Sequence, residues 1–290
     1  MKAHRDCIPC LDRMVDQIAR SVGQDPDMRD KVVRLGEALL REGYRPDRCA
    51  PWLTSYVLDQ IALKTGNPDP YQKIRQKEMA VAEEVFKRIR PRYGDDFRSA
   101  VELAVLGNNL DFFRGTAELE STLSKQRGDR LRFYIDHIDR TEKKLKSSKS
   151  GSIVFLADNA GEFFFDTPLV ERVTAMGIEV VYGVKERPFI NDLTWNDLER
   201  NGMLSQIPRV LSTGTGALLD LSSLSAAFRE QWDACDLIIS KGQANYECLT
   251  EFPIEKDVFY LLKAKCQPMR AMLRVPLHSY VALLVEPYTR

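Results

Sequence analysis

The chain has 290 residues, of which 44% are hydrophobic and 29% charged, which is typical of a folded globular protein and excludes a low-complexity disordered one. Lysine and arginine number 42, and aspartate and glutamate also number 42, so no net charge favours binding to nucleic acid or to an anionic membrane. No apolar run reaches the roughly 18 residues of a membrane-spanning helix, and charged residues interrupt the N-terminus where a signal peptide needs an apolar core. Six scattered cysteines do not resemble a secreted disulfide scaffold, so we expect a cytoplasmic protein.

The first motif in chain order is a cysteine pair, Cys7 and Cys10, with His4 just before it. Metal or redox chemistry is one interpretation, but a zinc site would need a fourth ligand and the chain has no second CxxC. The other interpretation is that the two cysteines lie one helical turn apart and pack as small hydrophobic residues. We favour packing.

Up to about residue 150, apolar residues recur at intervals of three and four, which predicts a series of amphipathic helices. Breakers at 66–68 and 91–94 separate successive helices. Asp95 and Asp96 are suited to cap a further helix. A Lys- and Ser-rich stretch at 143–152 is typical of a solvated joint. We therefore expect residues 1–150 to form a helical region that packs on the rest of the chain.

From Ser152 the pattern changes to short apolar runs that are rich in β-branched residues, with helical stretches between most of them. The runs are SIVFLA (152–157), IEVVYGV (178–184), RVLS (209–212), DLIIS (236–240), VFYLL (258–262) and YVALLV (280–285). Strands that alternate with helices predict a mostly parallel sheet covered on both faces, over 151–290. Ligands of such sheets bind at the carboxyl ends of the strands, so the residues after each run are candidates for a site.

The first two runs are followed by residues that suit a hard metal ion. Asp158 and Asn159 place two oxygen ligands side by side, and Mg²⁺ or Mn²⁺ prefers such ligands. Asp192 follows the second run and is placed to complete the site, since adjacent strand ends converge. Helix capping is the structural alternative for each of them, with Asn191 and Thr194 equally able to cap the second helix.

The later runs end in groups that suit an anion. The third leads into a small-residue loop at 212–216, which lets backbone amides approach a phosphate but lacks the ending of a P-loop, so an ordinary connection is equally compatible. The fourth leads to Lys241, beside amide side chains. The fifth is followed directly by Lys263, in LLKAKC, which is unusual next to so apolar a run because lysine is rarely buried without a partner. This lysine either extends to solvent or points into the site as a fixed positive charge.

Together these segments resemble the damage-control phosphatase family, the metal-dependent phosphatases that include the acidic-residue-methyltransferase-like proteins. The matching segments are CIPC (7–10), GNNLDF (107–112), LADNAGEFFFD (156–166), FINDLT (189–194), KGQANYE (241–247) and LLKAKC (261–266). The resemblance covers nearly the whole chain and implies a Rossmann-like α/β/α sandwich with a mostly parallel sheet, preceded by an N-terminal all-helical region. The FFFD segment is bulkier than expected and Ala244 replaces an expected glycine or apolar residue, but neither departure removes a ligand.

The resemblance also implies site residues. A divalent metal (Mg²⁺, Mn²⁺, Co²⁺ or Ni²⁺) would be held by Asp158, Asn159 and Asp192. The implied substrate-binding residues are Asn108, Asp111, Glu162, Lys241, Gln243, Asn245 and Lys263. In the chemistry that follows, lysine charges neutralise the phosphoryl group while Asp158 or Asp192 orients the attacking water, so the catalytic residues are Asp158, Asp192 and Lys263. An aspartyl-phosphate on Asp158 is the competing route.

The expected function is therefore metal-dependent hydrolysis of small phosphorylated metabolites, such as sugar phosphates or damaged phosphometabolites. The expected partner is a small-molecule phosphate ester, with no nucleic acid and no membrane. Two other functions are compatible with the same residues. One is an S-adenosylmethionine-dependent carboxyl methyltransferase, in which Glu186 after the second run would bind the ribose hydroxyls. The other is a non-catalytic protein that binds a phosphometabolite.

Overall fold

The computed structural model describes residues 1–22, 25–108, 130–147, 151–216 and 219–287. Its helices are α1 (Ile8–Val22), α2 (Pro26–Gly43), α3 (Ala50–Thr65), α4 (Gln72–Ile89), α5 (Phe97–Gly107), α7 (Ile138–Lys146), α8 (Phe163–Thr174), α9 (Trp195–Arg200), α10 (Ala226–Ala234), α11 (Gln243–Leu249) and α12 (Gln267–Leu273). Its strands are β1 (Phe133–Asp136), β2 (Ser152–Leu156), β3 (Glu179–Val184), β4 (Val210–Ser212), β5 (Leu237–Lys241), β6 (Asp257–Lys263) and β7 (Tyr280–Val285). All six apolar runs predicted to be strands are confirmed.

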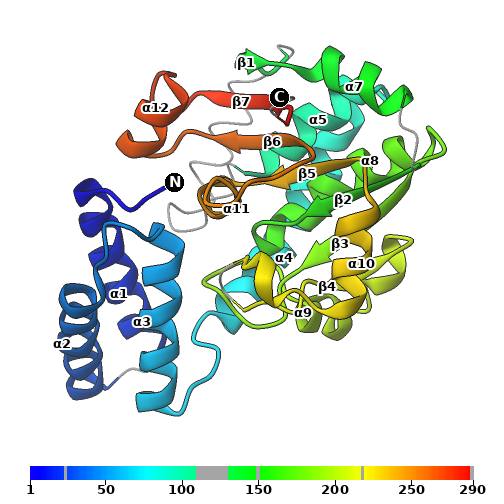
Figure 1. Ribbon diagram of the computed structural model, residues 1–290. Helices are drawn as coiled ribbons and strands as arrows, with labels where there is room; N and C mark the ends of the chain where they lie inside the picture. The colour runs from blue at the N-terminus through cyan, green and yellow to red at the C-terminus, as the bar shows by residue number, and fades with distance from the viewer. Residues whose placement is uncertain (23–24, 109–129, 148–150, 217–218, 288–290) are drawn as a thin grey trace.

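The strands form one sheet in the order β1-β7-β6-β5-β2-β3-β4 (Figure 1). The five strands from β6 to β4 are parallel, and β7 pairs antiparallel with β6. The chain order reverses between β2 and β5, because the chain runs outward from β2 to β3 and β4 and the crossover after β4 returns to β5 on the other side of β2. A reversal of this kind is where open α/β sheets place their ligands, at the carboxyl ends of the strands.

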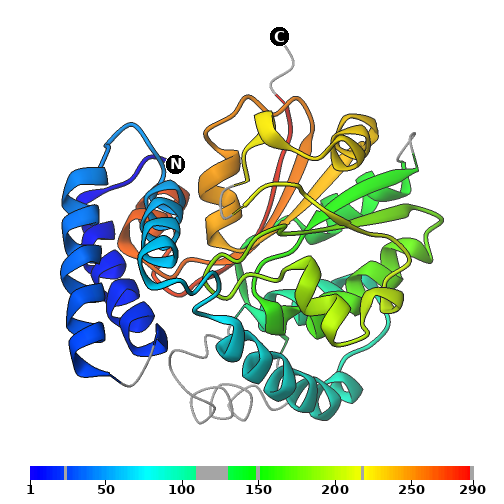
Figure 2. The ribbon, with the colours of Figure 1, turned by 90° about the horizontal axis from the view of Figure 1, so that it is seen from below.

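Helices cover both faces of the sheet, because alternate side chains of each strand face opposite layers. On β5, Ile239 packs into a core cluster with α4, α5, α7 and α8, whereas Ile238 packs into a second cluster with α10, α11 and α12. Figure 2 shows the sheet edge-on between these layers. The predicted α/β/α sandwich is confirmed.

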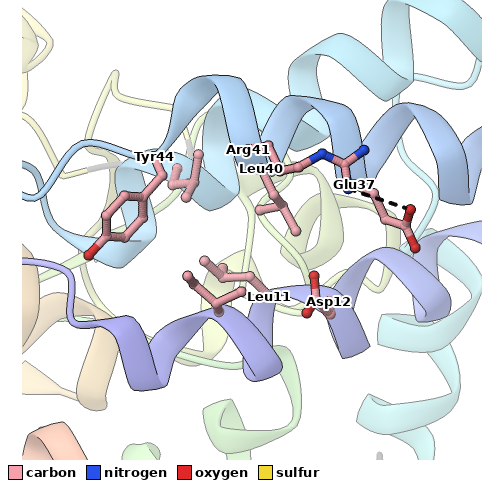
Figure 3. A pocket seen from close by; sticks show the side chains of 8 residues that line it. Leu11, Asp12, Glu37, Leu40, Arg41 and Tyr44 are labelled. Atoms are coloured by element: carbon pink, nitrogen blue, oxygen red, sulfur yellow. Dashed lines mark ion pairs between the residues drawn. The ribbon is translucent and has the colours of Figure 1, made fainter.

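Helices α1, α2 and α3 form a separate unit with its own apolar core. This core also includes Phe189, from the loop after β3, and Ala244 of α11 packs against it. The unit therefore lies against the carboxyl ends of the central strands (Figure 1). A hollow of about 460 Å³ lies on the unit itself, between α1 and α2, with Leu11 and Leu40 in its wall (Figure 3). Its lining residues all belong to the three-helix unit, and none follows a strand of the sheet.

Residues 1–150 were expected to be all helical, but they include one strand. This strand is β1, which pairs in parallel with β7. The strand has only four residues and alternates half-buried with exposed side chains, so it lacks the apolar run that identifies a central strand. The predicted cap of α5 is confirmed, since the side chain of Asp96 accepts a hydrogen bond from the backbone N–H of Ser99 at 3.0 Å. Within the described residues, no helix is long and apolar enough to cross a membrane.

Candidate active site

The polar residues after β2 and β5 are brought together by the close approach of two turns. Gly242 has a φ of +77°, and a Cβ at this position would lie 1.8 Å from Asp158 Oδ2, so only glycine allows the carboxylate to rest against this turn. Asn245 ties the two strand ends together, since its side-chain amide donates to the carbonyls of Ala157 (2.9 Å) and Lys241 (2.8 Å). Asn245 is thus buried in support of the site.

Two amide side chains hold two carboxylates side by side. The Nδ2 of Asn108, at the end of α5, donates to Asp158 Oδ2 (2.9 Å) and to Glu162 Oε1 (2.8 Å). The Nδ2 of Asn159 donates to the same two atoms, at 3.2 and 2.6 Å. Both amide nitrogens are used in this way, so each side-chain oxygen points elsewhere, and Asn108 Oδ1 is buried without a hydrogen-bond partner. The helical region therefore places Asn108 against Asp158 and Glu162, buried and not at a rim, and its substrate-binding role stays a prediction. Asp111 lies outside the described residues.

Glu162 also belongs to a buried ion-pair network. Lys241 Nζ lies 2.7 Å from Glu162 Oε2 and 2.5 Å from Asp166 Oδ1, and its side chain is 0% exposed. Tyr182 donates to the second oxygen of Asp166 at 2.9 Å. Lys241 shares the β5 face of Ile239, which is directed into the core layer. The sequence predicts that Lys241 and Glu162 bind substrate, whereas the structure shows both engaged with buried partners below the site.

Asp192 reaches the same place through backbone pairing of two loops. Asn159 and Asp192 form an isolated antiparallel bridge, and the N–H of Leu193 donates to the Asp158 carbonyl at 2.8 Å. The structure thus brings the three predicted metal ligands, from two different strand ends, into one site. Their coordination of a metal stays a prediction.

The charges of this cluster are those of a cation-binding site. Burial, and then the charges of Glu162 and Asp192, raise the pKa of Asp158 well above its usual range. Burial raises the pKa of Asp192 to about 6. Burial opposes ionisation of Glu162 too, but Lys241 and Lys265 hold its pKa below the ordinary value. Repulsion between buried carboxylates is relieved when a cation binds between them.

The donor set fits a hard divalent ion. Asp192 Oδ2 is buried without a hydrogen bond, and the ammonium of Lys185 lies 3.7 Å from it, too far to donate one. In the described part of the chain, no group of three His, Cys, Asp or Glu side chains is arranged to hold a metal. The predicted set instead combines two carboxylates with the amide oxygen of Asn159, which suits Mg²⁺ or Mn²⁺ better than zinc.

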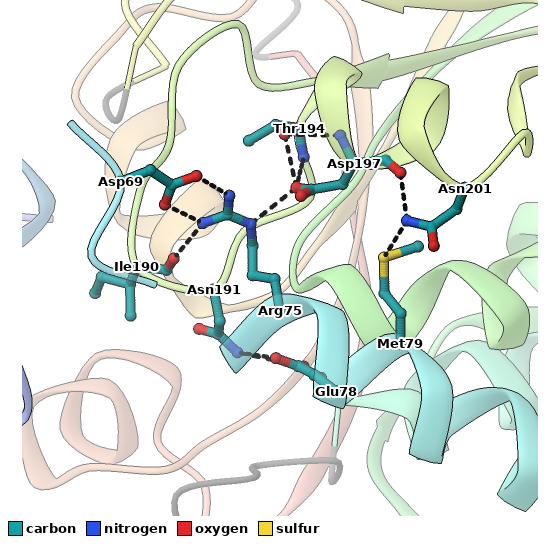
Figure 4. A network of polar contacts seen from close by, with 9 residues as sticks. All are labelled: Asp69, Arg75, Glu78, Met79, Ile190, Asn191, Thr194, Asp197 and Asn201. Atoms are coloured by element: carbon teal, nitrogen blue, oxygen red, sulfur yellow. Dashed lines mark hydrogen bonds and ion pairs between the residues drawn. The ribbon is translucent and has the colours of Figure 1, made fainter. Parts of the chain in front are cut away.

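The loop that carries Asp192 is fixed from behind by α4 (Figure 4). Arg75 donates to Asp197 Oδ2 (2.8 Å), to Asp69 Oδ1 (2.9 Å) and to the carbonyl of Ile190 (3.1 Å). Ile190 has a φ of +46°, which is strained for a β-branched residue, so this carbonyl must be held firmly. Glu78 accepts from the side chain of Asn191 at 3.1 Å. The network therefore determines the position of Asp192.

The remaining predicted site residues are Lys263 and Gln243, for which the structure shows contacts with groups other than Asp158 and Asp192. The ammonium of Lys263 lies 5.6 Å from the ring centroid of Tyr280 on β7, and its expected orientation toward Asp158 or Asp192 stays a prediction. Lys263 is the last residue of β6 and pairs with Tyr280 across the ladder to β7; its substrate-binding and catalytic roles stay predictions. Gln243 accepts from the N–H of Lys265 (3.2 Å) and donates to Glu247 (3.2 Å), so its side chain is committed to the turn after β6.

Two lysines of the site are not among the predicted residues. The ammonium of Lys185 is buried 3.4 Å from Asn245 Oδ1, close to Asp192. Its position directly after β3 is the same signal that identified Asp158 after β2. Lys265 and Lys241 are the lysines whose charges stabilise the ionised form of Asp158. Lys265 follows Lys263 by two residues within LLKAKC, and the sequence does not show which of the two faces the carboxylates.

Cys7 and Cys10 differ in their exposure to solvent. Cys7 is half-buried and packs against the core of α1–α3, as predicted for a small hydrophobic residue. Cys10 is exposed, so the packing interpretation is wrong for this residue. Helix α1 turns its other face, with Leu11 and Met14, toward the core.

Comparisons with known proteins agree with this architecture. The model of the damage-control phosphatase ARMT1-like domain matches residues 3–281. A damage-control phosphatase of Pyrococcus horikoshii is 33% identical over 98% of each chain, and one of Archaeoglobus fulgidus is 30% identical over 99% of this chain and all of its own. The crystal structure of a DUF89 family protein from Pyrococcus horikoshii superposes with a TM-score of 0.87 at 33% identity, covering 98% of this chain and 99% of that one. The chain therefore belongs to the ARMT1-like damage-control phosphatase family.

Proposed function

We propose that the protein is a phosphatase that hydrolyses phosphate monoesters of small metabolites, with a divalent cation held by Asp158, Asn159 and Asp192. The observation that carries the proposal is the convergence of buried carboxylates from two strand ends, with Asp192 Oδ2 lacking a hydrogen-bond donor. Family membership supports it, because two relatives of nearly the same length are named damage-control phosphatases.

The cation, when bound, would neutralise phosphoryl charge and lower the pKa of a coordinated water. Lys185 and Lys265 bring positive charge to the same edge of the sheet, where they attract the phosphate oxygens and oppose the build-up of negative charge during hydrolysis. Lys263 is the third lysine proposed to act on the substrate, from the side of β7.

Asp192 is the better placed of the two carboxylates to orient the attacking water. Its Oδ2 is not committed to a hydrogen bond, whereas Asp158 Oδ2 already accepts from two amides. Glu162 and Lys241 act as positioning residues, since their contacts orient the two asparagine amides.

The test is phosphate release by purified protein from a panel of sugar phosphates and nucleotides, with Mg²⁺, Mn²⁺, Co²⁺ or Ni²⁺ supplied separately. We expect release that requires one of these ions, is lost in EDTA and returns when the ion is restored. Methyl transfer from S-adenosylmethionine without phosphate release would contradict the proposal. Tight binding of phosphate esters without turnover under any of the ions would contradict it as well.

A further inference from the structure

Two buried cysteines meet where the three-helix unit contacts the sheet. Cys49 directly precedes α3 and Cys248 lies in α11, and these two helices pack against each other. Both side chains are buried in the core cluster that includes α10, α11 and α12, so Cys49 extends from its own unit into the core beside the sheet. The thiols of Cys49 and Cys248 hydrogen-bond to each other across this contact.

The two thiols differ in how readily each loses its proton. Cys49 lies at the N-terminus of a 16-residue helix, where the positive end of the helix dipole stabilises a thiolate. The hydrogen bond from Cys248 lowers the pKa of the Cys49 thiol to about 7, although burial opposes its ionisation. The same contact, together with burial, raises the pKa of Cys248 well above its usual range. Near neutral pH a substantial fraction of molecules therefore has a thiolate on Cys49 beside a thiol on Cys248, as a nucleophile and its resolving partner require.

Two other cysteines in this part of the molecule lack such an arrangement. Cys235 donates its thiol to the carbonyl of Trp232 at 3.2 Å, and burial raises its pKa to about 11. Cys266 accepts from the side chain of Gln243 at 3.2 Å, and burial raises its pKa as well. Burial thus keeps Cys235 and Cys266 as thiols, whereas Cys49 ionises despite its burial.

Cys49 is the member of the pair that an oxidant reaches from solvent. Residues 45–48, directly before it, are all exposed, and Cys49 itself is 5% exposed against 2% for Cys248. Cys248 follows Asn245 by three residues and so lies on the same side of α11, and Asn245 ties the ends of β2 and β5 together. A bond between the two cysteines would therefore tie the three-helix unit to the helix that supports the candidate active site.

We propose that Cys49 and Cys248 are a redox-reactive pair, and that hydrogen peroxide converts them to a disulfide between the three-helix unit and the sheet. The Cys49 thiolate attacks and breaks the peroxide O–O bond, which leaves a sulfenic acid on Cys49 and, after the released hydroxide takes up a proton, one water. The Cys248 sulfur then attacks the sulfenic sulfur, so that the S–S bond forms, the S–O bond breaks and a second water leaves. The two thiols lose two electrons and two protons, and the peroxide receives both. The inference does not depend on the proposed phosphatase activity.

The first test treats the reduced full-length protein with hydrogen peroxide, blocks the remaining thiols and identifies linked peptides by mass spectrometry. We expect a linkage between Cys49 and Cys248 that dithiothreitol reverses. We also expect Tm to rise by about 5 °C on oxidation, because the bond closes a long loop in the unfolded chain. Cys235→Ala removes a buried thiol outside the pair and should change neither result. Oxidation confined to other cysteines, such as a disulfide between Cys7 and Cys10, would overturn the inference, and this result needs no variant that has to fold.

The second test assigns the nucleophile and its resolving partner. Cys248→Ala leaves the sulfenic acid on Cys49 without a partner, so we expect peroxide followed by unfolding in dimedone to label Cys49 in this variant. Cys49→Ala should give no label on Cys248, and neither variant should show the rise in Tm. Cys10→Ser is the control at an exposed cysteine and should keep both the linkage and the rise in Tm. Equal labelling of Cys248 in the Cys49 variant, or a rise in Tm in either variant, would contradict the proposed reaction.

Discussion

Two arginines of this protein make nearly the same contacts in two different surroundings. Arg75 bridges Asp69 and Asp197 behind the candidate active site, with a side chain only 1% exposed. Arg98 bridges Asp136 and Asp139 beside the outer strand β1, with a side chain 23% exposed and an aspartate partner 84% exposed. Each arginine thus holds two carboxylates, but water screens only the second group.

The difference between the two arginines shows that the buried ion pairs, and not the exposed ones, hold the loops of the candidate site in position. An exposed ion pair contributes little to stability, because solvation and side-chain freedom compensate for its loss. A buried one is costly to break, since a charge is then left without water or partner. Near the strand ends of β2, β3 and β5, the buried charges Lys185, Lys241 and Arg75 all contact the loops that carry the candidate ligands. At the β1 edge the ion pairs lie on the surface and support no site.

The largest expected effect is on catalysis by the buried cluster. Asp158→Asn keeps the shape of the side chain and removes its charge, so we expect metal-dependent phosphate release to fall about 10³-fold or more. Asp139→Asn removes a carboxylate from the exposed cluster and should leave turnover within about 2-fold of wild type. Steady-state kinetics at saturating metal, with circular dichroism to verify the fold, measure both. If the Asp158 variant kept most of its activity, the metal-ligand assignment would be wrong.

The second comparison replaces the two arginines themselves. We expect Arg75→Met to lower the free energy of unfolding by about 3 to 5 kcal/mol, because Asp197 and the strained carbonyl of Ile190 lose their buried partner. Arg98→Met should lower it by less than about 1 kcal/mol. Urea unfolding gives both values. Equal losses in the two variants would mean that burial does not set the difference between the two arginines.

A smaller effect distinguishes Lys263, the last residue of β6, from Lys265, which follows the strand. Lys265 stabilises the ionised forms of Asp158 and Glu162, whereas the ammonium of Lys263 lies over Tyr280. We therefore expect Lys265→Met to lower kcat by about 10²-fold, and Lys263→Met to have the smaller effect. Single-turnover kinetics at saturating metal compare them. The reverse order would restore Lys263 to the catalytic position that the sequence predicts.

The strands, and the convergence of the polar residues that follow β2 and β3, were predictable because each is indicated by a short stretch of sequence. Each apolar run is a strand, although β7 is antiparallel to its neighbour β6. The polar residues directly after β2 and β3 can only lie at the carboxyl edge of the sheet. Strand β1 gives no such signal, because four residues with alternating exposure resemble a polar turn. Its pairing with β7 depends on residues almost 150 positions away.

The supporting contacts were not predictable, since they join segments far apart in the sequence. Arg75 and Asp197 are 122 residues apart, and each alone resembles an ordinary charged helix residue. Lys241 is an intermediate case. Its alternation with Leu237 and Ile239 on β5 indicates the face toward the core. It does not indicate the two carboxylates that bind it there, Glu162 just before α8 and Asp166 within it. The alternation along a strand therefore predicts which face of the sheet a charged residue lies on. Its ion-pair partner can be identified only from the three-dimensional structure.

The smallest expected effect is a pH dependence of stability that separates buried from exposed glutamates. Glu247 on α11 is buried, and burial raises its pKa from an ordinary 4.5 to about 7, although Gln243 donates to it. Between these values the folded protein keeps a proton that the unfolded chain releases, so stability falls as pH rises from about 4.5 to 7 and stays low above that. Glu247→Gln keeps the acceptor for Gln243 and removes the titration. The loss of unfolding free energy between pH 5 and pH 8 should then be smaller in the variant than in the wild type by more than about 1 kcal/mol.

Urea unfolding at the two pH values measures this difference, and other buried carboxyl groups, such as Asp166, cancel in the comparison of variant with wild type. Glu286 is the matched control, because it is exposed and pairs with Arg140 and Lys144. These cations hold the pKa of Glu286 below its ordinary value, so any contribution it makes is lost only as pH falls, below the window of the experiment. Glu286→Gln should therefore leave the change between pH 5 and pH 8 as it is in the wild type. An identical response of the two variants would show that Glu247 is ionised in the folded protein, and that α11 tolerates a buried charge next to the site.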